Sequence, residues 1–262
     1  MSGPVELRIA DGIAALHFNR PERMNVLSVD MAEAFAAAVD EVLAQASVRV
    51  LVLSGAGRNF MAGGDLQGFR TTDDRPGFIR ATIDPLHGAL KALARSDVVT
   101  LAAVHGRIAG AGVSLAAMAD LVVAAEGTSF TMAYTRIAGS PDCGGSWALP
   151  RVVGLKRAME MMLLNAPLEA EDALRAGLIN RIVPADRLME AAMEMARQLA
   201  AGPAAAQGSA KRLLRQAGET ALEDQLDAER AAFVRLAGLE DFNEGVSAFL
   251  DRRAPDFSRQ PE

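Results

Sequence analysis

The chain has 262 residues, of which half are hydrophobic, and it carries a formal net charge of −6. A chain of this length can bury a sizeable core in one large domain, and the negative charge, with no Lys/Arg-rich run, argues against nucleic acid as a partner. Its single cysteine excludes a disulfide framework and a cysteine-based zinc site, and it fits a reducing compartment.

The N-terminus has neither the basic start nor the apolar run of a signal peptide, and no apolar run reaches the roughly 18 residues of a membrane span. The three histidines are too scattered in sequence to suggest a metal cluster. We therefore expect a cytoplasmic protein that binds neither a membrane nor a metal.

Strands and helices alternate through the first half of the chain. Val5 to Ile9 and Ile13 to Phe18 alternate apolar and polar residues around Asp11-Gly12, which predicts a β-hairpin. Ser28 is the expected N-cap of a helix over 29–45, and the polar segment 71–77 is expected to be exposed and mobile. The remaining pattern predicts buried strands at 48–54, 98–104 and 121–125, and helices at 79–94 and 111–119. This order indicates an α/β fold with crossover connections.

Helical patterns dominate after Pro150, interrupted by a short predicted strand at 179–183 that Pro184 ends. We expect residues 1–200 to form the catalytic core and residues 201–262 to form a helical oligomerisation region. The apolar residues of that region need a surface to cover, and a neighbouring subunit is the expected one: Leu213, Leu214, Leu222, Leu226, Phe233, Leu236, Phe242 and Phe249.

Two predicted strands run directly into glycine-rich turns that open helices, at 55–65 and at 104–112. Such turns leave backbone N–H groups unpaired, and two of them can form an oxyanion hole for an acyl group. Tight packing of helix against strand explains the glycines equally well. A dinucleotide fingerprint is excluded, because Leu115 stands where a third glycine is needed.

Several segments resemble, in order along nearly the whole chain, the enoyl-CoA hydratase/isomerase (crotonase) superfamily. The segments FMAGGDL at 60–66 and AVHGRIAGAGVSLA at 103–116 resemble its two oxyanion loops. The resemblance continues through Asp120, Phe130, the turn at 141–150, AGLI at 176–179 and FLDR at 249–252. It implies a spiral of ββα units, a helical C-terminal trimerisation region, and a homotrimer or hexamer.

The resemblance also implies a substrate and a set of site residues. The substrate would be an acyl-CoA thioester, with no cofactor beyond the coenzyme A that is part of it. The N–H groups of Gly64 and Ala111 would hold the thioester oxygen. The expected substrate-binding residues are Arg23, Met24, Ala62, Asp65, Leu66, Ser114, Tyr134, Phe249 and Arg252, the last two from a neighbouring subunit.

The hydratases of this family carry two glutamates, and here Ser114 and Tyr134 stand at the matching positions. Neither side chain accepts a proton at neutral pH, so efficient hydration is not expected. Asp142 is the remaining carboxylate at a matching site, and its turn resembles the enoyl-CoA and ring-epoxide isomerase branch. One carboxylate suffices for a 1,3-proton transfer, which predicts an enoyl-CoA isomerase.

Other interpretations remain open for Asp142. It could cap the helix beginning near Gly144. It could be the nucleophile of an acyl-CoA dehalogenase or hydrolase, with His87 as the supporting base. The chain could also be a hydratase after all, or an acyl-CoA-binding protein that has lost catalysis.

Overall fold

A six-stranded sheet forms the centre of the molecule, whose computed structural model describes residues 3–257. The predicted hairpin, β1 (Val5–Ala10) and β2 (Ile13–Phe18), is confirmed and is antiparallel. Parallel strands then follow in the order β3, β4, β6 and β9, with bounds Val50–Gly55, Val99–Val104, Leu121–Ala125 and Arg181–Val183. The last strand begins two residues later than its pattern predicts.

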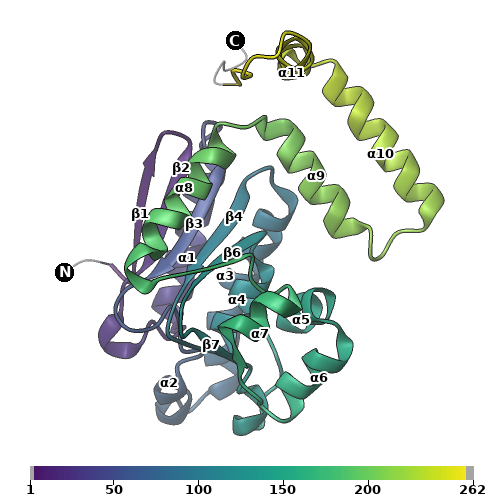
Figure 1. Cartoon of the computed structure of the whole chain (residues 1–262). Coiled ribbons are helices and arrows are strands. Elements are labelled where there is room, and N and C mark those ends of the chain that lie inside the picture. Colours follow the sequence, from purple (N-terminus) through teal and green to yellow (C-terminus); the bar gives the residue numbers. More distant parts are fainter. Residues whose placement is uncertain (1–2, 258–262) are drawn as a thin grey trace.

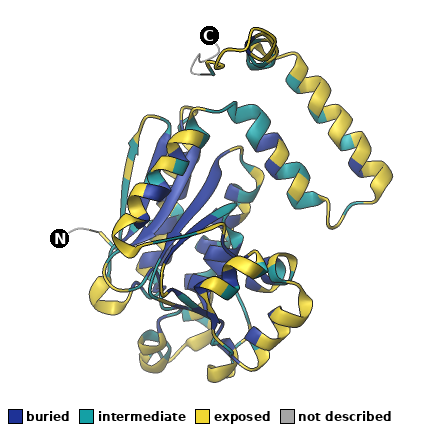
Figure 2. Ribbon diagram, in the orientation of Figure 1, coloured by how far each residue is buried: buried dark blue, intermediate teal, exposed yellow. Residues whose placement is uncertain are grey.

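Helices cover both faces of this sheet, which explains why its central strands β3 and β4 are buried throughout and largely apolar. On one face α1 (Val29–Ala44) and α3 (Arg75–Arg95) contact each other and enclose a cluster that includes Leu51 and Leu53. On the other face α8 (Leu188–Ala200) packs on a cluster that includes Val50 and Val52. Successive residues of a strand point to opposite faces, so each strand serves both layers. Figure 2 shows the buried residues concentrated in the sheet between these layers.

A second, three-stranded sheet was not predicted. It joins β5 (Arg107–Ala109), β7 (Ser129–Thr131) and β8 (Leu168–Glu169). Strands of two or three residues are too short to show a period in the sequence. The sheet matters for function, because β5 leads directly into α4 (Ala111–Met118).

One predicted helix start is confirmed and another is wrong. Helix α1 begins at Val29 with Ser28 at its N-cap position, as predicted, although the Ser28 hydroxyl donates to Asp30 and makes no capping bond. Helix α3 begins at Arg75, four residues early, because the Asp74 side chain accepts a hydrogen bond from the Gly77 N–H at 2.9 Å. Helix α2 (Leu66–Thr71) lies just before α3. Most of the segment 71–77, which was predicted to be an exposed and mobile loop, is therefore helical, and it is largely exposed.

Among residues 3–257, the remaining elements of the core are three helices and three short turns. They are the helices α5 (Gly145–Val153), α6 (Leu155–Leu163) and α7 (Ala170–Ala176) and the 3-10 turns Pro21–Arg23, Tyr134–Ile137 and Ala185–Arg187. None of the helices within residues 3–257 has the length and apolar character to cross a bilayer.

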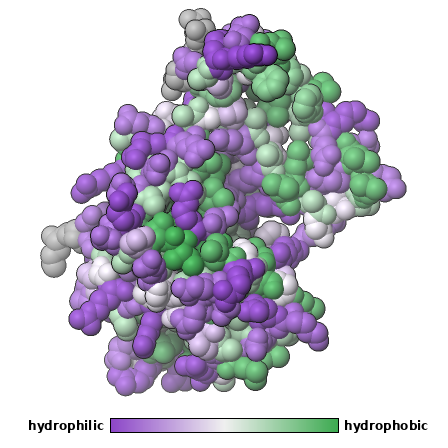
Figure 3. Space-filling model, in the orientation of Figure 1, coloured by the Kyte–Doolittle hydropathy of each residue, from purple (hydrophilic) through white to green (hydrophobic). Residues whose placement is uncertain are grey.

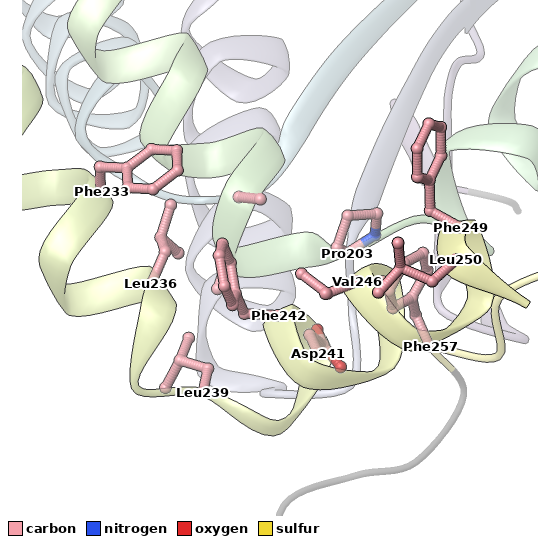
Figure 4. Close-up of a pocket in the computed structure, with 13 residues that line it drawn as sticks. Pro203, Phe233, Leu236, Leu239, Asp241, Phe242, Val246, Phe249, Leu250 and Phe257 are labelled. Atoms are coloured by element: carbon pink, nitrogen blue, oxygen red, sulfur yellow. The ribbon is translucent and has the colours of Figure 1, made fainter.

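Three further helices leave the core as an arm: α9 (Ala204–Gln216), α10 (Leu222–Ala237) and α11 (Glu240–Leu250). In Figure 1 the arm projects from the top of the sheet and ends far from α2. Hydrophobic residues gather over α10 and α11 in the space-filling view (Figure 3). They line a groove of about 500 Å³ that includes Phe233, Phe242 and Phe249 (Figure 4), and Phe249 is 83% exposed. The division into a core and an oligomerisation region at residue 200 stays a prediction, and its last residues, 258–262, lie outside the described part.

A buried ionic cluster fastens α9 to the core. Lys211 Nζ lies 3.2 Å from Asp120 and donates to the carbonyl oxygens of Leu93 and Val98 at 2.9 and 2.6 Å. Arg215 donates to Asp120 at 2.6 Å, and Asp120 also accepts from the backbone and side chain of Thr100. Burial alone would raise the pKa of Asp120, but the charges of Lys211 and Arg215, with these hydrogen bonds, outweigh it and lower that pKa.

Candidate active site

The first glycine loop leaves β3 and ends at the start of α2. Leu27 fixes its end from both sides, because the Leu27 N–H donates to the Gly63 carbonyl at 2.7 Å and its carbonyl accepts from the Asp65 N–H at 3.2 Å. Gly63 has φ of +96°, a backbone conformation that favours glycine. No hydrogen bond recorded within residues 3–257 uses the Gly64 N–H, which is therefore available to a ligand.

The second glycine loop brings another unpaired N–H beside the first. Gly110 has φ of +49° and ψ of −119°, which turns the chain from β5 into α4. Ala111 is the first residue of α4, so its N–H precedes the intrahelical bonds and has no acceptor among the described residues. A Cβ placed on Gly63 would lie 3.2 Å from the Ala109 carbonyl oxygen, so the two loops are in contact. The two unpaired N–H groups therefore lie on loops that contact each other, which makes them candidates for the donors of an oxyanion hole.

Asp142 reaches this region through a chain of hydrogen bonds. Tyr134 donates its hydroxyl proton to Asp142 Oδ1, and Ser114 Oγ lies 3.1 Å from the Tyr134 oxygen. A phenol has one proton, so Ser114 is the donor in the second bond. Ser114 stands one turn after Ala111 on α4, and the Tyr134 ring lies 4.0 Å from the position of a Cβ on Gly110. The chain Ser114–Tyr134–Asp142 therefore connects the carboxylate to the second oxyanion loop.

The groups around Asp142 stay protonated. Burial, together with the charge of Asp142 and their hydrogen bond, raises the pKa of Tyr134. Burial and the same charge also raise the pKa of the Cys143 thiol, which lies fully buried beside it. Neither a phenolate nor a thiolate is available here, so Asp142 is the candidate base.

The turn that carries Asp142 does not use it as a helix cap. Helix α5 begins at Gly145, its N-cap is Gly144, and no side chain caps it. The capping interpretation of Asp142 is therefore wrong.

His87 supports this turn from α3. Its Nε2 accepts a hydrogen bond from the Cys143 N–H at 3.1 Å. That contact occupies the lone pair which a general base would need at Nε2. The structure thus brings His87 to the Asp142 turn, but as an acceptor from the backbone.

The residues predicted to bind the coenzyme A side divide into two groups. Arg23 pairs with Asp65 at 2.9 Å, and the Ala62 N–H donates to the Met24 carbonyl at 3.1 Å, so these four lie together beside exposed Leu66. Asp65 also caps α2 by accepting from the Gly68 N–H at 3.0 Å, so its side chain fixes its own loop. Phe249 and Arg252 lie at the end of the arm, and within one chain they do not join the site (Figure 1).

Two features of the site were missed from the sequence. Phe69 and Phe78 meet edge to face at 5.8 Å, and Phe69 lies within 3.5 Å of the position of a Cβ on Gly64. Buried Asn25 donates to the carbonyl oxygens of Ala56, Asn59 and Phe60 and so braces the first loop. The position of Asn25 at the end of a turn-rich segment was a weak sequence signal for its role. The Phe69–Phe78 contact has no sequence signal, because it depends on how α2 packs against α3.

Potential metal ligands do not gather in this structure. Within residues 3–257 no group of three or more His, Cys, Asp or Glu side chains is placed to hold a metal ion.

Comparison with known proteins agrees with this architecture. Residues 8–260 match the family model described as enoyl-CoA hydratase/isomerase. Two relatives from Escherichia coli K12 cover almost the whole chain. A 1,2-epoxyphenylacetyl-CoA isomerase is 38% identical over 95% of this chain and 96% of its own length, and a 2,3-dehydroadipyl-CoA hydratase is 35% identical over 94% of each.

The fold agrees as well. The crystal structure of an enoyl-CoA hydratase from Polaromonas sp. JS666 superposes with a TM-score of 0.91 at 32% identity, covering 96% of this chain and 98% of the other. The predicted crotonase-like α/β fold is therefore confirmed. With its two contacting glycine loops and a family match over nearly all its length, the chain belongs to the enoyl-CoA hydratase/isomerase family.

Proposed function

We propose that the protein isomerises the double bond of an enoyl-CoA by a one-base 1,3-proton transfer through Asp142. The observation that carries this proposal is the chain Ser114–Tyr134–Asp142. A serine and a tyrosine stand at the two positions where hydratases of the family carry glutamates. The tyrosine donates a hydrogen bond to Asp142, and the serine donates one to the tyrosine.

The proposed steps use groups that the site provides. Asp142 removes a proton from C2 of a 3-enoyl thioester, and the electron pair moves toward the thioester oxygen. The N–H groups of Gly64 and Ala111 hold that oxygen as negative charge develops, and losing one such donor typically costs about 10²–10³-fold in rate. The carboxylic acid then returns a proton at C4, which leaves a conjugated 2-enoyl thioester and a regenerated carboxylate.

Hydration is the second candidate, because relatives at 35–38% identity include hydratases by name. Water addition needs a group to activate the water and one to deliver a proton to the substrate. Ser114 and Tyr134 supply no second carboxylate, and Tyr134 keeps its proton. Nucleophilic dehalogenation or hydrolysis needs a supporting base, and the His87 lone pair is already engaged by the Cys143 N–H. The site thus favours isomerisation over both.

The test is incubation of the protein in D₂O with a 3-enoyl-CoA and, separately, with a 2-enoyl-CoA. We expect the 3-enoyl-CoA to gain the ultraviolet absorbance of the conjugated product, with deuterium at C4 or C2 by mass spectrometry. Rapid formation of a 3-hydroxyacyl-CoA would instead identify a hydratase. Turnover of neither substrate would contradict both candidates and favour the nucleophilic or the binding-only interpretation, which a panel of aromatic acyl-CoA thioesters would separate.

We propose further that the coenzyme A side of the site is lined by Arg23, Met24, Ala62, Asp65 and Leu66.

We also propose that the arm packs on neighbouring subunits in a homotrimer or hexamer. Support comes from the apolar groove and from exposed residues such as Phe249 and Leu250 (Figure 4). Apolar surfaces of this extent usually mark interfaces. Light scattering should give the mass of three or six chains, and Phe249→Asp should reduce it. A wild-type monomer would contradict this assembly.

A further inference from the structure

We infer that His87 is a positioning residue, whose neutral imidazole holds the turn that carries Asp142 and makes the site dependent on pH. The inference rests on the proposed role of Asp142. It assigns no chemical step to His87, because the ring nitrogen accepts a hydrogen bond from the backbone next to the candidate base.

The turn after Asp142 needs support, because two successive residues adopt left-handed backbone conformations. Cys143 has φ of +52° and Gly144 has φ of +78°. For a residue with a side chain this conformation is unfavourable. Gly144 is also wedged against α4, since a Cβ there would lie 2.6 Å from the Met118 sulfur. The hydrogen bond from the Cys143 N–H to His87 Nε2 fixes the turn from the opposite side, on α3.

This hydrogen bond sets the protonation state of His87. A backbone N–H can only donate, so Nε2 must be the unprotonated nitrogen, and the ring hydrogen is on Nδ1. A doubly protonated ring has no acceptor and would turn an N–H toward the Cys143 N–H. Protonation of His87 must therefore break the bond and release the turn beside Asp142.

Protons from solvent can reach the ring. His87 is half-buried and lines a surface cavity of about 320 Å³ between α3, α4, α5 and α9, together with Met118, Gly144 and Trp147. The charged groups that line this cavity are Lys91 on the same helix, one turn on, and Arg215 from α9. Asp142 precedes the bonded Cys143 in the chain, and Asp84 lies one turn before His87 on α3. Arg215 is itself paired with Asp120, and no carboxylate lies among the described residues that line the cavity.

The test compares His87→Gln with His87→Leu. A glutamine oxygen can occupy the place of Nε2 and accept the same hydrogen bond, but it does not titrate, whereas leucine offers no acceptor. For His87→Leu we expect kcat to fall about 10–100-fold with KM nearly unchanged, as for a displaced catalytic group. His87→Gln should retain kcat within about 3-fold of wild type at pH 8. On acidification the wild type should lose more activity than His87→Gln, because only the imidazole loses its acceptor nitrogen by protonation.

A second readout does not depend on turnover. Trp147 is the one tryptophan of the chain and lines the same cavity as His87. Its fluorescence should change between pH 8 and 5 in the wild type and stay constant in His87→Gln. The indole also donates to Glu219 at 2.8 Å, so Glu219→Gln serves as the control and should retain the transition.

These readouts separate the inference from the proposed function. If the protein isomerises no enoyl-CoA but the fluorescence transition disappears in His87→Gln, the proposed function fails and the role of His87 in the turn stands. Loss of activity in His87→Gln equal to that in His87→Leu would overturn the inference, since the imidazole itself would then take part in the chemistry. Full activity in His87→Leu, or a transition unchanged in His87→Gln, would overturn it as well.

Discussion

Asp142→Asn is expected to lower the isomerase kcat by about 10²–10⁴-fold, the range that a positioned acid–base group contributes. Asparagine has the shape of aspartate and can still accept the hydrogen bond from Tyr134, so the turn and the protein fold should be preserved. The amide cannot take the C2 proton. KM should therefore change little while kcat falls, and no deuterium from D₂O should enter the substrate.

Tyr134→Phe is the matched control for this experiment. It removes the hydrogen bond to Asp142 Oδ1 and leaves the carboxylate in place. We expect a smaller loss, about 10-fold, because the carboxylate loses orientation but remains a base. An Asp142→Asn variant as active as the wild type would exclude Asp142 as the base, and an equal loss in both variants would mean that Tyr134 itself transfers a proton.

Asp120→Asn is expected to reduce the free energy of unfolding by about 3–5 kcal/mol, the cost of removing one partner from a buried ion pair. Lys211 would keep its contacts with the carbonyl oxygens of Leu93 and Val98, but its charge would lose its buried counter-ion. Burial already lowers the pKa of Lys211 against the opposing effect of Asp120. Denaturation by urea, followed at a fixed protein concentration, measures the change.

Two controls test this explanation. Asp172→Asn breaks an exposed pair with Arg175 and should cost at most about 1 kcal/mol. Adding Lys211→Met to Asp120→Asn removes the uncompensated charge and should recover part of the loss. If Asp120→Asn costs no more than Asp172→Asn, the cluster does not fasten α9.

The same cluster predicts how stability depends on pH. The folded-state pKa of Asp120 lies below its unfolded-state value, so its stabilisation is fully present above the unfolded value of about 4. It is lost as the pH falls through the folded-state value. The wild type should therefore lose more stability than Asp120→Asn when the pH is lowered below about 4.

The central sheet and the candidate catalytic residues could be predicted from the amino-acid sequence. The hairpin at Asp11-Gly12 and the buried strands β3, β4 and β6 follow from local turn chemistry and from apolar runs that two covered faces require. Glycine-rich turns after strands indicate free N–H groups. The resemblance to the crotonase family then implies Gly64 and Ala111 as the donors and Asp142 as the remaining carboxylate.

Which of these side chains lie in contact depends on the tertiary structure. The sequence could not show that Tyr134 donates to Asp142, that His87 receives the Cys143 N–H across 56 residues, or that Lys211 reaches Asp120. It also missed the small sheet and the Phe69–Phe78 pair. Local patterns report the period of a single helix or strand, whereas these contacts depend on how elements distant in the chain pack together.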